Sequence, residues 1–261
     1  SERWGAEIGA HLHPWNTPPL QELPYPEPVP SELIPKDLLA AKLQTLLDTM
    51  KRAGFAPVSF RMGRFNLGPN MFSLLEEISD IQVDSSVAPL RRYYGGPVYL
   101  GLKTDPYFPN PSDPLESGSS HILEVPITIV PLLPRLGRLM DLLDRTSIFP
   151  DRWIPELTAK VVSLSIQPMW TGLSQLKAAV KLHERQGGRV LTIHFHSSEI
   201  MVGGCPQHST RALVDLFLAK LSHFLSWLRK DKNVEPVTLS ELGAIYRAQR
   251  TSYPKQSAKS D

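Results

Sequence analysis

A single cysteine, Cys205, occurs in the 261 residues, so an internal disulfide framework is excluded. No apolar run reaches the ~18 residues that a membrane-spanning helix needs. There is no basic run and the formal net charge is only +2, so nothing in the charge pattern points to nucleic acid. The glycines at 63 and 68 lack the GxGxxG spacing of a phosphate-binding loop. These absences favour a globular domain with no membrane span and no nucleic-acid partner.

The overall composition is that of an ordinary globular domain. Hydrophobic residues make up 41% of the chain and charged residues 21%, and the length suits one α/β barrel. The 25 prolines cluster at 14–35 and 89–134, where interleaved aromatic residues indicate ordered loops. We expect one domain over 1–261 with a flexible tail at 249–261. Because Ser1 has no initiator methionine beside it, we also expect natural sequence upstream.

Hydrophobic periodicity predicts strands that alternate with helices. The predicted strands are 6–13, 57–62, 81–85, 122–127, 161–167, 189–196 and 237–239. The predicted helices are 37–54, 68–79, 134–143, 171–186, 209–230 and 240–248. Such alternation indicates βα units and a parallel sheet.

Within the predicted strands, polar and apolar side chains alternate. Thr192, His194 and His196, for example, alternate with apolar residues. A covered open parallel sheet would be apolar on both faces, whereas a barrel with a polar lumen explains one polar face. Barrels of this type place active sites at the carboxyl ends of their strands, where these polar residues gather. The sequence therefore predicts an α/β fold, an irregular or incomplete barrel of about six or seven parallel strands.

His11 and His13 stand at the end of the first predicted strand, before Pro14. Side chains two apart in a strand point to the same face, so the two imidazoles can share a metal ion. A catalytic metal usually takes three protein ligands. The pair therefore needs a further ligand from elsewhere.

Three other strand ends carry groups capable of chemistry. His196 suits a general acid or base, a metal ligand or a buried structural histidine, and His194 precedes it on the same face. Arg61 forms a structural ion pair with Asp84 or orients a catalytic carboxylate, since a buried charge needs a partner. Glu124 is another inward-facing candidate.

Aromatic residues beyond strand ends either stack on sugar rings or pack loops; these are Trp15, Trp170 and Tyr107. Cys205 lies in a loop with no histidine partner in the sequence pattern. The remaining histidines are predicted to be surface or helix residues: His121, His183, His208 and His223.

Four segments, taken in order, resemble the motifs of polysaccharide deacetylases, the NodB-like members of carbohydrate esterase family 4. The first is Glu7-Ile8-Gly9-Ala10-His11-Leu12-His13-Pro14-Trp15, which is similar to the family's metal-binding histidine motif in a bacterial subgroup with a compact His-x-His-Pro-Trp form. The others are Ser59-Phe60-Arg61-Met62-Gly63-Arg64, Val83-Asp84-Ser85-Ser86-Val87 and Phe195-His196-Ser197-Ser198-Glu199. The resemblance runs from Glu7 to about Leu242.

The resemblance implies a hydrolase that uses a divalent metal, zinc being the first expectation, to remove N-acetyl groups from a carbohydrate. It implies His11 and His13 as metal ligands and His196, Arg61 and Asp84 as catalytic residues, with Asp84 holding His196 or lining the pocket. We expect substrate contacts from Trp15, Arg64, Ser85 and Glu199.

One departure separates this chain from the family pattern. The family's first motif is an aspartate pair that supplies the third metal ligand and the catalytic base, and no such segment precedes His11 here. The sequence therefore leaves a second hypothesis open, a catalytically inactive carbohydrate-binding domain on the same barrel. A glycosidase that uses Asp84 and Glu124 is a third, but it leaves the histidine pairs unexplained.

Overall fold

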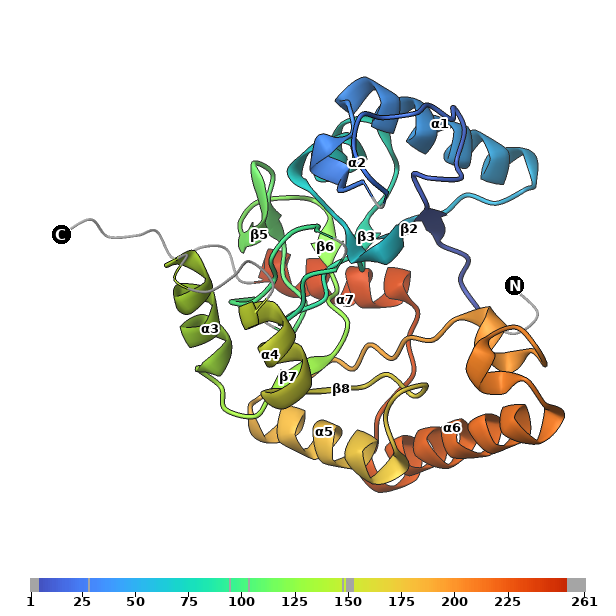
Figure 1. Ribbon diagram of the computed structural model, residues 1–261, viewed down its shortest axis with the longest axis vertical. Coiled ribbons are helices and arrows are strands. Elements are labelled where there is room, and N and C mark those ends of the chain that lie inside the picture. Colours follow the sequence, from blue (N-terminus) through green and yellow to red (C-terminus); the bar gives the residue numbers. More distant parts are fainter. Residues whose placement is uncertain are drawn as a thin grey trace.

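The computed structural model describes residues 5–252, except 28, 94, 103, 147 and 149–152. Its centre is a four-stranded parallel sheet (Figure 1). The strand order is β1 (Ala10–Leu12), β2 (Ser59–Met62), β3 (Val83–Asp84) and β6 (Leu123–Glu124). The predicted parallel sheet of an α/β fold is therefore confirmed, with strands much shorter than predicted.

Seven helices and four short 3-10 turns surround the strands in the described residues. The helices are α1 (Lys36–Arg52), α2 (Pro69–Ile78), α3 (Leu136–Arg145), α4 (Trp153–Val161), α5 (Leu173–Arg185), α6 (Arg211–Lys232) and α7 (Leu239–Ser252). The 3-10 turns are η2 (Ser31–Leu33), η3 (Gly63–Phe65), η4 (Ser197–Ile200) and η5 (Pro206–His208). None of the described helices is long and apolar enough to cross a bilayer.

The last helix starts and ends differently from its prediction. The backbone N–H of Glu241 donates to Thr238 Oγ1, and the Glu241 carboxylate accepts from the Thr238 N–H, which is a capping box. The helix therefore begins at Leu239 rather than after a Ser240 cap, and no strand forms at 237–239. It continues to Ser252, so 249–252, the start of the predicted tail, is helical; 253–261 lie outside the described residues.

The structure does not confirm a barrel of six or seven parallel strands. β8 (Ser163–Ser165) pairs antiparallel with β7 (Ile129–Pro131) instead of joining the parallel sheet. The predicted strand at 189–196 forms no ladder. There the Thr128 N–H donates to the Thr192 carbonyl, and the Thr128 hydroxyl accepts the Thr192 N–H at 2.8 Å. The Thr128 hydroxyl thus takes the position that a backbone carbonyl of a second strand would have in a ladder.

The long segment at 88–120, expected to be an irregular loop, forms two short strands. It contains an antiparallel hairpin of β4 (Pro109–Asn110) and β5 (Asp113–Ser117).

At one edge of the parallel sheet, β1 pairs only with β2 among the described residues. The second edge of β1 therefore has no strand partner there.

Separate clusters of buried apolar side chains form the cores at the two ends of the molecule. One lies between the sheet and the helices α1 and α2, where Leu12, Leu39 and Phe60 are almost completely buried. Another joins α5 to α6 through Leu176 and Phe224. Figure 1 shows α1 and α2 at one end and α5 and α6 at the other, with the sheet and α7 between them.

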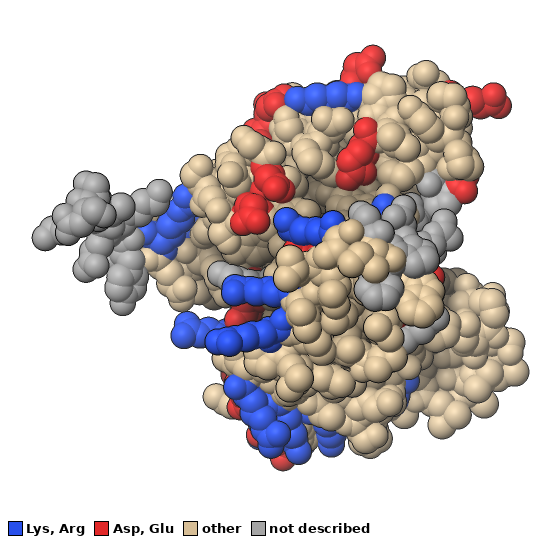
Figure 2. Space-filling model, turned by 60° about the vertical axis from the view of Figure 1, so that its left-hand side comes forward, with Lys and Arg blue, Asp and Glu red and all other residues tan. Residues whose placement is uncertain are grey.

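The surface charges are also divided between these ends. On the face shown in Figure 2, acidic side chains gather mainly toward the end that holds α1 and α2, and basic ones mainly toward the opposite end. On this face the two signs of charge are therefore separated rather than evenly mixed.

Candidate functional site

A cleft of about 1020 Å³ opens where β1 and β2 end. Its lining comes from β1, β2, η3 and the extended segment that leads into η4. Among the predicted site residues, the lining includes His11, His13, Trp15, Arg61, Arg64, Trp170, His194 and His196. Asp84, Ser85 and Glu199 are absent from it. The structure therefore gathers the histidines and arginines of three distant segments into one cavity.

The two histidines of β1 converge as their spacing predicts. His11 Nε2 and His13 Nε2 are 2.7 Å apart. Nδ1 of His11 lies 2.7 Å from the Arg61 carbonyl, which can only accept, so this nitrogen carries the proton. The lone pair of His11 is then on Nε2, the atom that faces His13. A backbone carbonyl fixing one nitrogen so that the other can bind a metal is a common supporting arrangement.

Their surroundings keep both imidazoles neutral. Burial lowers the pKa of His11. Burial lowers the pKa of His13 to about 4, and electrostatic interactions with His11, Arg64 and His196 act in the same direction. A neutral imidazole is the form that ligates metals. Among the described residues, no group of three or more His, Cys, Asp or Glu side chains is placed around one ion.

Arg61 joins the cleft to the interior of the sheet. Its Nε donates to the Ser85 carbonyl and its Nη2 to the Ser85 hydroxyl, both at 2.8 Å. Its guanidinium also lies over the Phe65 ring. Ser85 is fully buried, and its hydroxyl donates a hydrogen bond to the Val125 carbonyl. Ser85, expected beside the substrate, is therefore occupied in holding Arg61.

Asp84 and Glu124 are neighbours in register on β3 and β6, and both are completely buried. Asp84 accepts from the hydroxyl and N–H of Ser86, and Glu124 accepts from the Val87 N–H. Burial, followed by the charge of Asp84, raises the pKa of Glu124 well above its usual value.

This burial changes two expectations. Asp84 neither lines the cleft nor contacts His196 through any hydrogen bond in the described structure. It faces Glu124 and Arg61 instead, because β3 lies between β2 and β6. The glycosidase hypothesis also fails, since both carboxyl groups are buried inside the sheet and neither lines the cleft, so they cannot flank a sugar.

His196 takes its partner from its own segment. It stands at the start of η4, and its Nδ1 lies 2.9 Å from Oε1 of Glu199. The Glu199 side chain is only 6% exposed, against 70% for His196. Glu199, expected to contact the substrate, is therefore turned away from the cleft and toward His196.

Trp15 and Arg64 form the outer wall of the cleft. The Trp15 ring stacks on His13 at 4.4 Å between centroids, and the Arg64 guanidinium lies 3.8 Å from the centre of the Trp15 ring. Arg64 and Phe65 both have positive φ angles, of 58° and 53°. Such conformations cost free energy in residues other than glycine and cluster at functional sites. Neither this turn nor the contact of Phe65 with Arg61 was predicted from the sequence.

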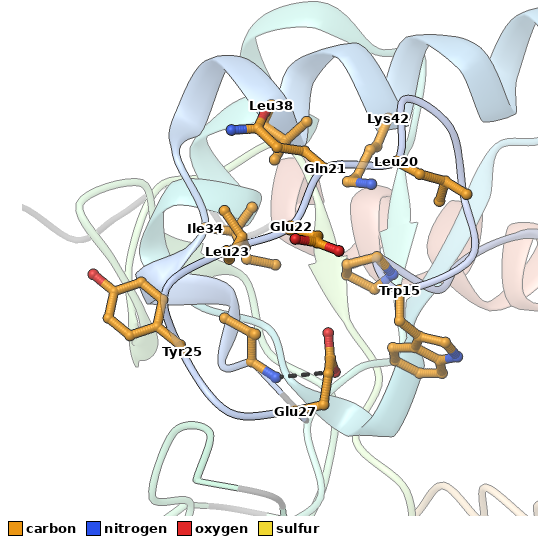
Figure 3. A pocket seen from close by; sticks show the side chains of 12 residues that line it. Trp15, Leu20, Gln21, Glu22, Leu23, Tyr25, Glu27, Ile34, Leu38 and Lys42 are labelled. Carbon is orange, nitrogen blue, oxygen red and sulfur yellow. Dashed lines mark hydrogen bonds between the residues drawn. The ribbon is translucent and has the colours of Figure 1, made fainter.

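A second hollow of about 410 Å³ adjoins the cleft and shares Trp15 with it (Figure 3). It lies between the proline-rich loop and α1, with Trp15 and Tyr25 on opposite sides in this view. The loop is tied to α1 by the buried Lys42, whose ammonium donates to the carbonyls of Thr17 and Pro19. The prediction of an ordered loop is confirmed here.

The remaining candidates lie outside the cleft or pack in it. Tyr107 donates to the Pro114 carbonyl beside the hairpin. Cys205 is half-buried beside η5. Among the other histidines, His183 and His208 are buried, while His121 and His223 are exposed. Trp170, which is 66% exposed, lines the cleft and remains a candidate for sugar contact.

His194 is buried beside Phe65, and its Nδ1 has no hydrogen-bond partner in the described residues. Burial, then the positive charges of Arg61 and His196, lowers its pKa from 6.5 to about 4. As the pH falls, His194 of the unfolded chain therefore takes up its proton at a higher pH than His194 of the folded chain. The free energy of unfolding should fall as pH drops from about 6.5 to about 4. The loss should be at most on the order of 3 kcal/mol from this residue.

Urea denaturation of metal-free protein across this pH range measures the loss. His194→Leu should reduce the pH dependence, whereas His223→Leu, at an exposed position, should leave it as in the wild type. Identical pH dependence in the wild type and His194→Leu would contradict the assignment of His194 as a buried neutral group.

Comparisons with known proteins add little beyond the fold. No family model matches the chain, and no curated protein matches it significantly. Among solved structures, the chain is similar to the crystal structure of a presumed polysaccharide deacetylase from Mycobacterium smegmatis, with 16% sequence identity and a TM-score of 0.46. The similarity covers 87% of this chain and 62% of that one, so this chain spans under two thirds of the length of that protein.

Proposed function

We propose that the cleft is the active site of a metal-dependent hydrolase that removes N-acetyl groups from a carbohydrate. One observation carries the proposal: two neutral imidazoles meet at their Nε2 atoms inside a large cleft that also holds His196 and two arginines. The same residues lie in the segments whose order resembles the motifs of polysaccharide deacetylases.

The residues present fit part of a metal site. His11 has its tautomer fixed by the Arg61 carbonyl, and His13 stands against it, so the pair supplies two imidazole ligands for a divalent ion such as zinc. We propose that a carboxylate from outside residues 1–261 supplies a third ligand and a second one the general base. Among the described residues, the second edge of β1 beside the cleft has no strand partner, so such a segment has a place to pair there.

In this proposal, the side chains that line the cleft have separate roles in the reaction. When bound, the metal supplies Lewis-acid activation of the acetyl carbonyl and of water. His196 donates a proton to the leaving amine, which departs poorly as an anion. Arg61, held by Ser85, adds a fixed positive charge beside the histidines. Trp15, Arg64 and Trp170 contact the sugar at the rim.

Acetate release tests the proposal directly. The full-length protein, loaded with zinc, should release acetate from N-acetylated sugar oligomers, and a chelator should abolish the release. His196→Asn should reduce kcat at least about 100-fold, which is the usual contribution of general acid catalysis. His223→Asn, on an exposed helix face, serves as the matched control. Full activity in His196→Asn would refute the assignment.

A non-catalytic carbohydrate-binding domain is the second candidate. It is favoured by the finding that only two metal-ligating side chains converge in the described residues. In that case the full-length protein should bind the same oligomers, with affinity reduced by Trp170→Ala, and release no acetate.

A further inference from the structure

The imidazole of His196 has a partner that lies three residues further along the chain. The Glu199 N–H donates to the His196 carbonyl at 2.9 Å and closes the η4 turn. In a 3-10 turn the side chains at positions i and i+3 eclipse each other. The turn therefore brings Glu199 Oε1 to 2.9 Å from His196 Nδ1, a distance typical of a charge-assisted hydrogen bond.

Glu199 is a buried carboxylate held in place by its surroundings. Its backbone carbonyl accepts from the buried His208, and α6 packs against η4. Lys220 of α6 acts on Glu199 only through its charge, because its ammonium bonds the carbonyls of Pro168 and Thr171. Oε2 of Glu199 has no hydrogen-bond partner among the described residues. His196 is thus the one hydrogen-bond donor that the described side chains offer to this carboxylate.

No other described carboxylate is placed for the same task. Asp84 is enclosed by Ser86 and Glu124 inside the sheet. Glu7 lines the cleft, but its carboxylate accepts from the Ser240 N–H at the start of α7. The exposed His196 ring and the buried Glu199 carboxylate therefore form an isolated pair at the wall of the cleft.

From this geometry we infer that Glu199 is the positioning residue for His196. It accepts the Nδ1 proton, so the ring is held with Nε2 toward the cleft and the neutral form is the Nδ1–H tautomer. This role rests on the proposed deacetylase function. Protonated His196 gives its Nε2 proton to the leaving nitrogen as the C–N bond breaks, and it keeps the proton on Nδ1. Glu199 accepts this hydrogen bond throughout and takes no proton from His196, as the buried carboxylate of a catalytic triad does.

Glu199→Gln tests the pair with almost no change in shape. Glutamine can turn its NH2 group toward Nδ1, which then must accept, so neutral His196 shifts to the Nε2–H tautomer. We expect kcat of the zinc-loaded full-length protein to fall 10- to 100-fold, with KM changed less than twofold. Nitrogen NMR of labelled histidine, at a pH that keeps the ring neutral, should show the tautomer change.

Glu76→Gln is the matched control, because Glu76 pairs with the exposed His121 outside the cleft. It should alter neither kcat nor the His196 signal. Unchanged kcat in folded Glu199→Gln would overturn the inference. If that variant does not fold, the wild-type spectrum decides: a neutral Nε2–H tautomer for His196, assigned by its loss in His196→Asn, overturns it equally. Absence of acetate release by the wild type would refute the deacetylase proposal, while the NMR result would still report on the pair.

Discussion

Replacing His11 with alanine in the full-length protein is expected to abolish stoichiometric zinc binding and to lower kcat/KM for acetate release at least about 1000-fold. The reason is geometric. The Nε2 atoms of His11 and His13 are 2.7 Å apart, so removing one leaves the other as the only imidazole at that point of the cleft. A metal that activates water and carbonyl contributes several kcal/mol to catalysis, and this contribution would be lost with the ion.

Metal analysis of the purified variant and an acetate assay with added zinc measure the two effects separately. His13→Ala should behave like His11→Ala, and the double variant should be no worse than either single one, because residues that act as a unit are not additive. His223→Ala is the control on an exposed helix face. Retention of one zinc per chain in His11→Ala would remove His11 from the metal site.

Replacing Arg61 with methionine should lower the free energy of unfolding by about 3–5 kcal/mol, the usual cost of leaving a buried charge without its partner. Arg61 donates to the carbonyl and hydroxyl of Ser85 and lies in the field of Asp84 and Glu124. Burial lowers the pKa of Arg61, whereas these two carboxyl groups act in the opposite direction. Methionine fills similar space but leaves the carboxyl pair with no cation.

A double-mutant cycle separates the charge effect from packing. Adding Asp84→Asn to Arg61→Met should cost less than the sum of the single changes, because it removes the carboxylate that lost its partner. Arg211→Met is the matched control: its ion pair with Asp215 is exposed on α6, so the expected change is within about 1 kcal/mol. Urea denaturation measures five proteins: the wild type, Arg61→Met, Asp84→Asn, the double variant and Arg211→Met. Equal losses in Arg61→Met and Arg211→Met would show that the buried network contributes no more than a surface pair.

The histidine pair was predictable because strand periodicity is a local rule. His11 and His13 share a face whatever the rest of the chain does. The parallel sheet was predictable for the same reason. The direction in which the Asp84 side chain points was not predictable. It depends on Glu124 lying in register on β6, the neighbouring strand in the sheet, 40 residues further along the chain. Sequence periodicity marked both residues as polar-face candidates without showing that they face each other.

The incomplete barrel of about six or seven parallel strands is not confirmed, for a different physical reason. The segment at 189–196 has the alternation of a strand, and the Thr128 N–H donates to its Thr192 carbonyl. The return bond from the Thr192 N–H, however, ends on the Thr128 hydroxyl, where a ladder would need a backbone carbonyl. The role of Glu199 was also hidden, because its position depends on the chain forming a 3-10 turn after His196 rather than a helix or a loop. Histidine and glutamate three residues apart were the only local signal.

In the part of the chain that the structure describes, the second edge of β1 has no strand partner, which bears on how this protein avoids aggregation. An unpaired strand edge is a template for pairing with another chain, and long flat edges aggregate. β1 covers only Ala10–Leu12, and Pro14 follows it with no N–H to donate. Such a short edge can accept one specific strand, yet it offers too few hydrogen bonds for copies to stack into an extended sheet. Lengthening β1 would therefore raise the risk of fibre formation before it improved the fold.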